Sequence, residues 1–181
     1  MKRIPVFILL FFLLKACSNS TNTGAHQADS MATMPSGKQT NDRKETTLNN
    51  IVLEKITGFK ITSAFLADEK GNLLHPQNTI PAGYPVFLTI RIQDGWTLQK
   101  GYASPGASQA ILTHNNEPVL QSRDLFANIP RVKKEDAGTI RLKTLITATR
   151  SDIRHYTIRF RVWDKWGEGE ITGHYRLQVK P

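Results

Sequence analysis

Apolar and polar residues alternate with period two along much of the chain after residue 50. In the stretch 86–93 the even-numbered residues are apolar, and Thr89, Arg91 and Gln93 stand between them. This alternation is typical of a half-buried β-strand. It recurs in four further segments, at residues 59–65, 140–146, 156–163 and 171–179, and the segment 110–120 holds two short apolar runs, 110–112 and 119–120. The pattern therefore predicts a series of antiparallel strands with one apolar face each.

Turn signals separate these segments. Asp68-Glu69-Lys70-Gly71 follows the first strand, and His114-Asn115-Asn116-Glu117 predicts a hairpin between two strands of the segment 110–120. No window predicts a long amphipathic helix, although residues 120–129 predict a short one that ends before Pro130. Residues 50–181 have an ordinary length for one domain. We predict an all-β fold, an antiparallel β-sandwich, over this range.

A tyrosine-led alternation near the C-terminus ends in an Asp…Gly turn, in the order Tyr156-x-Ile158-x-Phe160-x-Val162-x-Asp164-x-x-Gly167. This segment resembles the penultimate strand and turn of immunoglobulin-like and fibronectin-III-like domains. The resemblance implies an immunoglobulin-like β-sandwich. The strand pattern leaves a different strand order open, including a transthyretin-like sandwich.

The first 16 residues have the composition of a signal peptide. Two cations, Lys2 and Arg3, precede the apolar run 4–14, which is shorter than the roughly 20 residues of a membrane-spanning helix. The run leads into Leu14-Lys15-Ala16-Cys17, which resembles the lipobox of bacterial lipoproteins, and Cys17 is the only cysteine. The resemblance implies that residues 1–16 are removed and that Cys17 carries a lipid anchor. We expect attachment to a membrane of the cell envelope, on the periplasmic side of the outer membrane.

Residues 17–49 differ in composition from both neighbouring parts. Serine, threonine, asparagine, glycine and glutamine dominate after Cys17, and no periodicity appears. Such a segment buries too little apolar surface to offset its ordering entropy. We predict a flexible tether with a root-mean-square span of about 30 Å.

The sequence offers no catalytic or metal-binding constellation. The loop 101–106 has glycines at the wrong spacing for a nucleophile elbow, and Pro105 follows Ser104 where a backbone N–H would be needed. The five histidines form no HxH or HExxH pair. Asp164, Glu168 and Glu170 could offer oxygen ligands to calcium, but their spacing does not fit an EF-hand loop. We expect no enzymatic activity, no metal and no cofactor.

Charge and aromatic residues suggest a binding surface. The net charge is +9, or +6 without residues 1–16, and the charges of the tether cancel. Exposed tryptophans and arginines are common at binding hot spots. The candidate surface consists of Arg91, Arg159, Arg161, Arg176, Trp96, Trp163 and Trp166. If their strands share one sheet, the arginines form a cationic stripe.

These features predict a membrane-anchored envelope lipoprotein with a non-catalytic binding module, an accessory or scaffolding subunit of an envelope assembly. A protein partner is expected, and export argues against nucleic acid. The alternative is a carbohydrate-binding lipoprotein that uses exposed tryptophans; the same rings could equally cover the open end of the sandwich.

Overall fold

The computed structural model describes residues 46–48, 50–147 and 154–180. The predicted signal peptide, Cys17 and nearly all of the predicted tether lie outside these residues. In the described part, no helix is long and apolar enough to cross a membrane.

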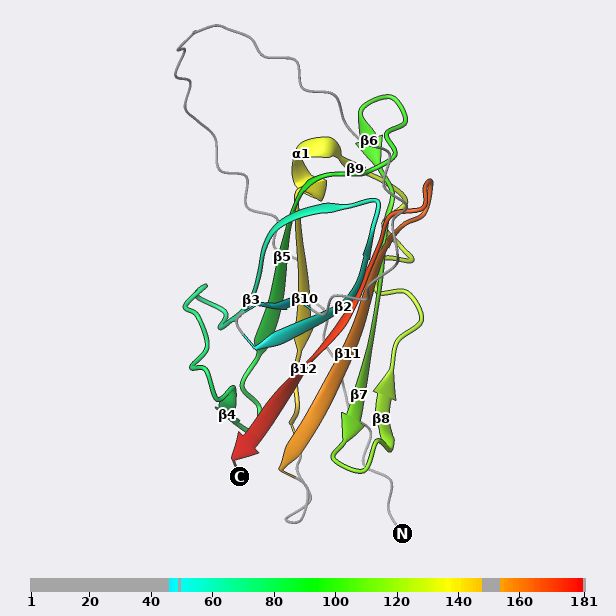
Figure 1. The fold of residues 1–181 in the computed structure, drawn as a ribbon. Helices are drawn as coiled ribbons and strands as arrows, with labels where there is room; N and C mark the ends of the chain where they lie inside the picture. Colours follow the sequence, from blue (N-terminus) through cyan, green and yellow to red (C-terminus); the bar gives the residue numbers. More distant parts are fainter. Residues whose placement is uncertain (1–45, 49, 148–153, 181) are drawn as a thin grey trace, which may run out of the picture.

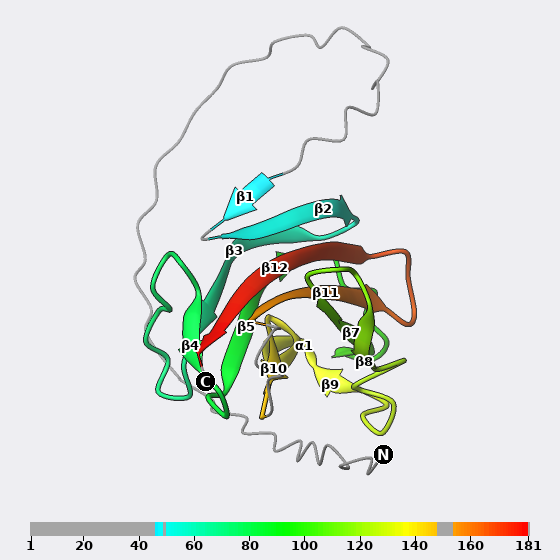
Figure 2. The same ribbon diagram turned by 90° about the horizontal axis from the view of Figure 1, so that it is seen from below.

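Two β-sheets packed face to face form the domain (Figure 1, Figure 2). The larger sheet has the strand order β1 (Thr46–Leu48), β2 (Ile51–Thr57), β12 (Glu170–Lys180), β11 (His155–Asp164), β7 (Pro105–Thr113) and β8 (Pro118–Gln121). A seventh strand, β4 (Thr79–Pro81), runs parallel to the C-terminal end of β12, and the other neighbours are antiparallel. β1 precedes the predicted domain boundary at residue 50.

The smaller sheet has three antiparallel strands in the order β10 (Thr139–Thr144), β5 (Val86–Asp94) and β3 (Lys60–Ala67). A short pair, β6 (Tyr102–Ala103) with β9 (Val132–Lys133), lies beside the helix α1 (Lys134–Ala137) at one end of the sandwich (Figure 1). These two sheets and their packing confirm the predicted all-β sandwich.

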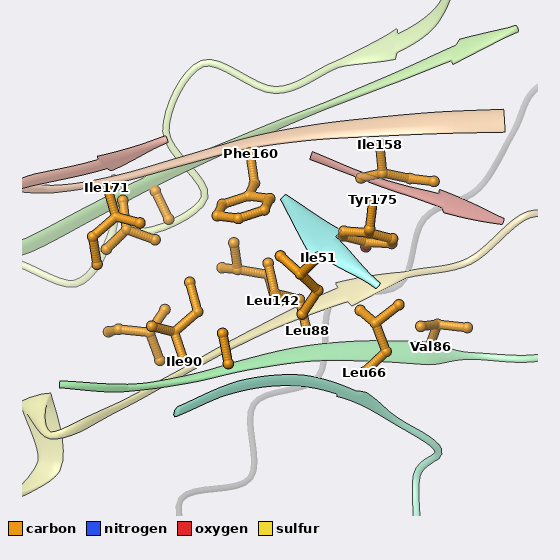
Figure 3. Close-up of a cluster of buried hydrophobic side chains, with 14 of the residues drawn as sticks. Ile51, Leu66, Val86, Leu88, Ile90, Leu142, Ile158, Phe160, Ile171 and Tyr175 are labelled. Atoms are coloured by element: carbon orange, nitrogen blue, oxygen red, sulfur yellow. The ribbon is translucent and has the colours of Figure 1, made fainter. Parts of the chain in front are cut away.

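The period-two alternation places the core between the sheets. In β11 the even-numbered residues are buried, whereas Arg159 and Arg161 point to the opposite, exposed face. Ile158 and Phe160 of β11 meet Leu88 of β5 across the interior (Figure 3). Burial of such side chains is the main driving force for joining the two layers.

A buried polar contact also joins the sheets. The Tyr175 hydroxyl of β12 lies 2.7 Å from Oγ1 of Thr144 on β10. The Gln109 amide of β7 donates to the same Thr144 oxygen over 3.3 Å. All three side chains are buried. Because buried polar groups are costly unless they are paired, this contact favours one arrangement of the sheets.

The predicted hairpin in segment 110–120 is confirmed as β7 and β8, but the prediction of a helix at residues 120–129 is wrong. β8 takes the first positions, and the backbone at Leu125 then bonds to β7, while the Ile129 N–H and the Phe126 carbonyl close a turn over 3.0 Å. The Leu125 N–H donates to the Ala107 carbonyl over 2.6 Å, and the Asp124 carboxylate accepts from the Phe126 N–H over 2.8 Å. The backbone N–H groups of Leu125 and Phe126 are therefore not available for helical hydrogen bonds. A helix of one turn, α1, forms later in the chain.

Candidate functional site

Three of the four predicted arginines share the outer face of the larger sheet. Arg159 lies opposite His174 in the β11–β12 register, and Arg161 lies opposite Thr172. Arg176 lies on the same face, opposite Thr157. All three arginines are exposed. We call Arg159, Arg161 and Arg176 the arginine face.

Acidic side chains neutralise part of the arginine face. Glu170 pairs with Lys55 and with Nε of Arg161, the latter over 2.5 Å. The hydrogen bond from Lys55 is the main cause that lowers the pKa of Glu170, and partial burial opposes it. Glu54 lies 2.8 Å from Nδ1 of His174. The cations on this face are therefore interspersed with carboxylates.

A polar hollow of about 420 Å³ lies beside β12, between the first residues of β2 and the segment that precedes β4. His174 and Arg176 line one side of it, and Asn50 and Asn78 lie on the other. The Asn78 amide donates to the Arg176 carbonyl over 3.0 Å, which holds the two sides together. The hollow extends the arginine face toward the C-terminal end of β12.

Arg91 is the exception, so the condition for a stripe of all four arginines, that their strands share one sheet, is not met. Its strand β5 belongs to the smaller sheet, so Arg91 points away from the arginine face. The strand alternation gives the correct face for the strands that carry these four arginines, but it carries no information about which strands share a sheet.

The outer face of the smaller sheet combines cations with aromatic rings. The guanidinium carbon of Arg141 lies 4.6 Å from the centroid of the Phe87 ring, and Lys143 Nζ lies 5.9 Å from it. The guanidinium carbon of Arg91 lies 5.8 Å from the Phe65 centroid. We call Arg91, Arg141, Lys143, Phe65 and Phe87 the basic face. In β3, β5 and β10 the only acidic residue is Asp94, at the end of β5.

Sequence reasoning missed four residues of the basic face. Arg141 and Lys143 occupy the polar positions of the segment 140–146, so their outward direction could have been predicted. Phe65 could not, because register shifts on either side of Ile61 reverse the faces that follow. Ala64 is then buried, and Phe65 points outward.

The buried carboxylate of Asp164 links the chain segments that carry the three tryptophans. Asp164 accepts from the Thr97 N–H over 2.6 Å and from the Trp166 N–H over 3.0 Å. This ties the Trp96 segment to the β11–β12 hairpin. Both carboxylate oxygens of Asp164 therefore accept hydrogen bonds from the backbone around this turn. In the described residues, no group of three or more His, Cys, Asp or Glu side chains could hold a metal ion.

Each tryptophan is only half-exposed. Trp96 packs against Phe59 with ring centroids 4.7 Å apart, and its indole N–H donates to the Ala137 carbonyl over 3.1 Å. The indole of Trp163 lies across Gly106, where a Cβ would approach within 2.1 Å of the ring. The Arg161 guanidinium carbon lies 4.9 Å from the Trp163 centroid. Trp96 thus covers an end of the core, and Trp163 stacks with protein groups.

An apolar cleft of about 450 Å³ lies at the open side of the sandwich, between β10 and the β6–β9 pair. Phe126, Ala137 and Ile140 are buried in its wall, and Ile129 and Val132 are half-buried. Its charged lining residues are Arg131, Lys133, Arg141 and Asp136. We call this the apolar cleft. Concave, mostly apolar sites with a few charged groups are typical of ligand binding.

No protein-family model matches the chain, and no curated protein matches it either. Several solved structures are similar in fold. The C-terminal domain of Wzt is 14% identical, with a TM-score of 0.43, over 68% of this chain and 74% of that one. A Niemann-Pick type C2 protein from the Japanese carpenter ant is 9% identical, with a TM-score of 0.42, and the match covers 70% of this chain and 96% of that one. The soluble domain of PmoD from Methylocystis sp. ATCC 49242 (Rockwell) is 12% identical, with a TM-score of 0.36, and the match covers 75% of this chain and 97% of that one.

Proposed function

We propose that this protein is a non-catalytic binding module, held at a membrane of the cell envelope by a lipid on Cys17. Its basic face binds an acidic surface of a partner protein, and the module acts as an accessory or scaffolding subunit of an envelope assembly. The observation that carries the proposal is the composition of that face, which has three cations and two phenylalanines.

Two physical arguments support the basic face as the binding surface. Arginine and aromatic residues dominate hot spots because they combine a large contact area with directional polar groups. The cations also lack neighbouring carboxylates within their own three strands, apart from Asp94 at the end of β5. An unneutralised positive surface attracts an acidic partner over a distance and speeds association.

The shape of the face favours a protein over a small molecule. Outward side chains of three neighbouring strands form a broad surface, which suits the large and nearly flat interfaces of protein complexes. Small molecules bind in concave sites that bury most of their surface. The arginine face is the weaker candidate because Glu54 and Glu170 offset part of its charge.

The carbohydrate alternative gains no support from Trp96 or Trp163. Trp96 is committed to packing and to a hydrogen bond with Ala137, so it offers no free platform for a sugar ring. The Arg161 guanidinium lies over the ring of Trp163. A sugar would first have to displace that arginine.

Matched charge reversals on the two faces test the proposal. The full lipidated protein is crosslinked in cells, and the captured proteins are identified by mass spectrometry. We expect Arg91→Glu/Arg141→Glu to reduce capture of the main partner by at least tenfold, since repulsion replaces attraction. Arg159→Glu/Arg176→Glu changes the net charge equally on the arginine face and should leave capture unchanged.

Thermal unfolding of both double variants verifies that the domain is folded. Loss of capture in the arginine-face variant alone would overturn the assignment and return the site to the larger sheet. Equal capture by both variants and by the unaltered protein would rule out both faces. A polysaccharide titration that quenches tryptophan fluorescence would then support the carbohydrate alternative.

A further inference from the structure

We infer that the apolar cleft binds a second, small ligand: an amphipathic anion, with a hydrocarbon chain inside the cleft and an acidic head at its rim. This inference does not rest on the proposed function, because the cleft opens at the side of the sandwich and the basic face covers the outside of the smaller sheet. Arg141 is the single residue that belongs to both.

The cleft exists because the two sheets end differently on this side. In the larger sheet β7 continues into β8, whereas β10 is the last strand of the smaller sheet. The loop after β8 and the helix α1 lie on this side of the sandwich (Figure 2), and residues of both line the cleft. A volume of about 450 Å³ falls within the range of roughly 300–1,000 Å³ that small-molecule sites occupy.

The wall of the cleft suits a hydrocarbon chain. Phe126, Ala137 and Ile140 are buried there and also belong to the interior of the domain. Ile129 and Val132 are half-buried nearer to solvent. An apolar chain that covers these side chains removes apolar surface from water on both partners.

The rim of the cleft suits an anion. The guanidinium carbon of Arg131 lies 4.7 Å from the ring centroid of Tyr102, which also lines the cleft. Lys133 and Arg141 add two positive charges, against the single carboxylate of Asp136. In the described part of the chain, none of the ion pairs includes Arg131, Lys133 or Arg141. Their charges are therefore available to an acidic head group, and a cationic head would be repelled.

Calorimetric titration of the full chain with defined amphiphiles tests this inference. Octanoate, decanoate and dodecanoate, each below its micelle concentration, should bind about fourfold more tightly for each added methylene. Dodecyltrimethylammonium has the same chain with the opposite charge and should not bind measurably. Lauroyl-lysophosphatidylglycerol has the same tail under a phosphate head, and its affinity relative to dodecanoate identifies whether a phospholipid or a free acid is preferred.

Three variants locate the binding site. Ile129→Trp should fill the cleft and abolish dodecanoate binding, whereas Arg131→Gln should weaken it by about tenfold or more through loss of a charged partner. Arg131→Gln should also reduce the preference for dodecanoate over dodecanol. Arg159→Gln removes the same charge from the arginine face and should leave binding unchanged. Circular dichroism verifies that each variant is folded.

Several outcomes would overturn the inference. The first is equal affinity for dodecanoate and dodecyltrimethylammonium. The second is an affinity that does not change with the length of the hydrocarbon chain. The third is a heat of dodecanoate binding that is the same in Ile129→Trp as in the unaltered protein. Loss of the captured partner protein in Ile129→Trp, without amphiphile binding by the unaltered protein, would instead make the cleft part of the protein interface. The Arg91→Glu/Arg141→Glu variant alters the cleft rim at Arg141, whereas Arg91→Glu alone changes no residue of the cleft lining. Partner capture and dodecanoate binding by the Arg91→Glu variant therefore separate failure of the proposed function from failure of this inference.

Discussion

Tyr175 shows how one residue contributes to both packing and polar pairing. Its ring is buried in the core, and its hydroxyl reaches Thr144 of the opposite sheet at 2.7 Å. Burial raises the pKa of the Tyr175 phenol well above its usual range, so the group stays neutral and can donate at physiological pH. The contact joins β12 to β10, strands that share no backbone hydrogen bonds.

Replacing this hydroxyl should destabilise the domain without changing its shape. We expect Tyr175→Phe to lower the free energy of unfolding by about 0.5–1.5 kcal/mol, because one buried hydrogen bond is lost. Urea denaturation measures the change. Tyr102→Phe removes a hydroxyl from a half-buried ring and serves as the control.

A double-mutant cycle with Thr144→Val determines whether the two residues act together. If the hydrogen bond is responsible, the double variant should lose less stability than the sum of the single variants. Strict additivity, or a Tyr175→Phe protein as stable as the original, would show that the contact contributes nothing.

At the scale of the element, the β11–β12 hairpin holds its charged and aromatic side chains in a defined order. Trp163 can lie flat on β7 because the residue beneath it is Gly106. Glu170 then pairs with Arg161 across the hairpin and with Lys55 across the β12–β2 pair. Three neighbouring strands of the larger sheet are therefore linked by one carboxylate on their outer face.

This carboxylate should make stability depend on pH in the acidic range. The pKa of Glu170 is lower in the folded protein than its ordinary value of 4.5, chiefly because Lys55 donates a hydrogen bond to it. The stabilisation is therefore fully present above about pH 4.5 and is lost as the pH falls through the lower, folded pKa. Lys55 and Arg161 are about half-exposed, so solvent limits the effect to roughly 0.2–1 kcal/mol.

Thermal unfolding of Glu170→Gln between pH 2.5 and pH 7 provides the measurement. The variant should be less stable than the original protein near neutral pH, and the difference should shrink toward the acidic end. Glu168→Gln, in the exposed turn beside it, is the control. A stability difference that stays constant across this range would contradict the role of the charge.

At the scale of the whole molecule, the sandwich presents two basic surfaces that point in opposite directions. The arginine face covers the larger sheet and the basic face covers the smaller one. A partner that binds one face leaves the other accessible. This arrangement suits a scaffolding role, in which one module contacts more than one component of an assembly.

The proposed anchor belongs to this scale too, because it sets where both faces act. In cells grown with an alkyne-bearing palmitate analogue, the full chain should acquire the label, and Cys17→Ser should not. Ser18→Ala leaves the acceptor sulfur in place and should label normally. Gel fluorescence after coupling a dye to the alkyne measures incorporation. An unlabelled wild-type protein, expressed at the same level, would rule out the lipid anchor.

Sequence alone was enough to predict the strands β3, β5, β7, β8, β10, β11 and β12 and, for most of them, the face that turns inward, but it did not reveal β2 or the short strands. Period-two alternation in β5, β11 and β12 results from local geometry, since neighbouring side chains of a strand point to opposite sides. For that reason the outward direction of Arg91, Arg159 and Arg161 could be predicted. The absence of long amphipathic helices followed from the same periodicity.

Only the tertiary structure decided which strands share a sheet, and with it the composition of each surface. Strand pairing depends on contacts between residues far apart in the chain, which alternation within one strand does not encode. Arg91 consequently lies on the same outer face as Arg141 and Phe65, and not on the face of Arg159. The register shifts near Ile61 place the Phe65 side chain on that outer face. The apolar cleft likewise has no signature in the sequence, because its wall brings together loop, helix and strand residues that meet only where the two sheets end at different strands.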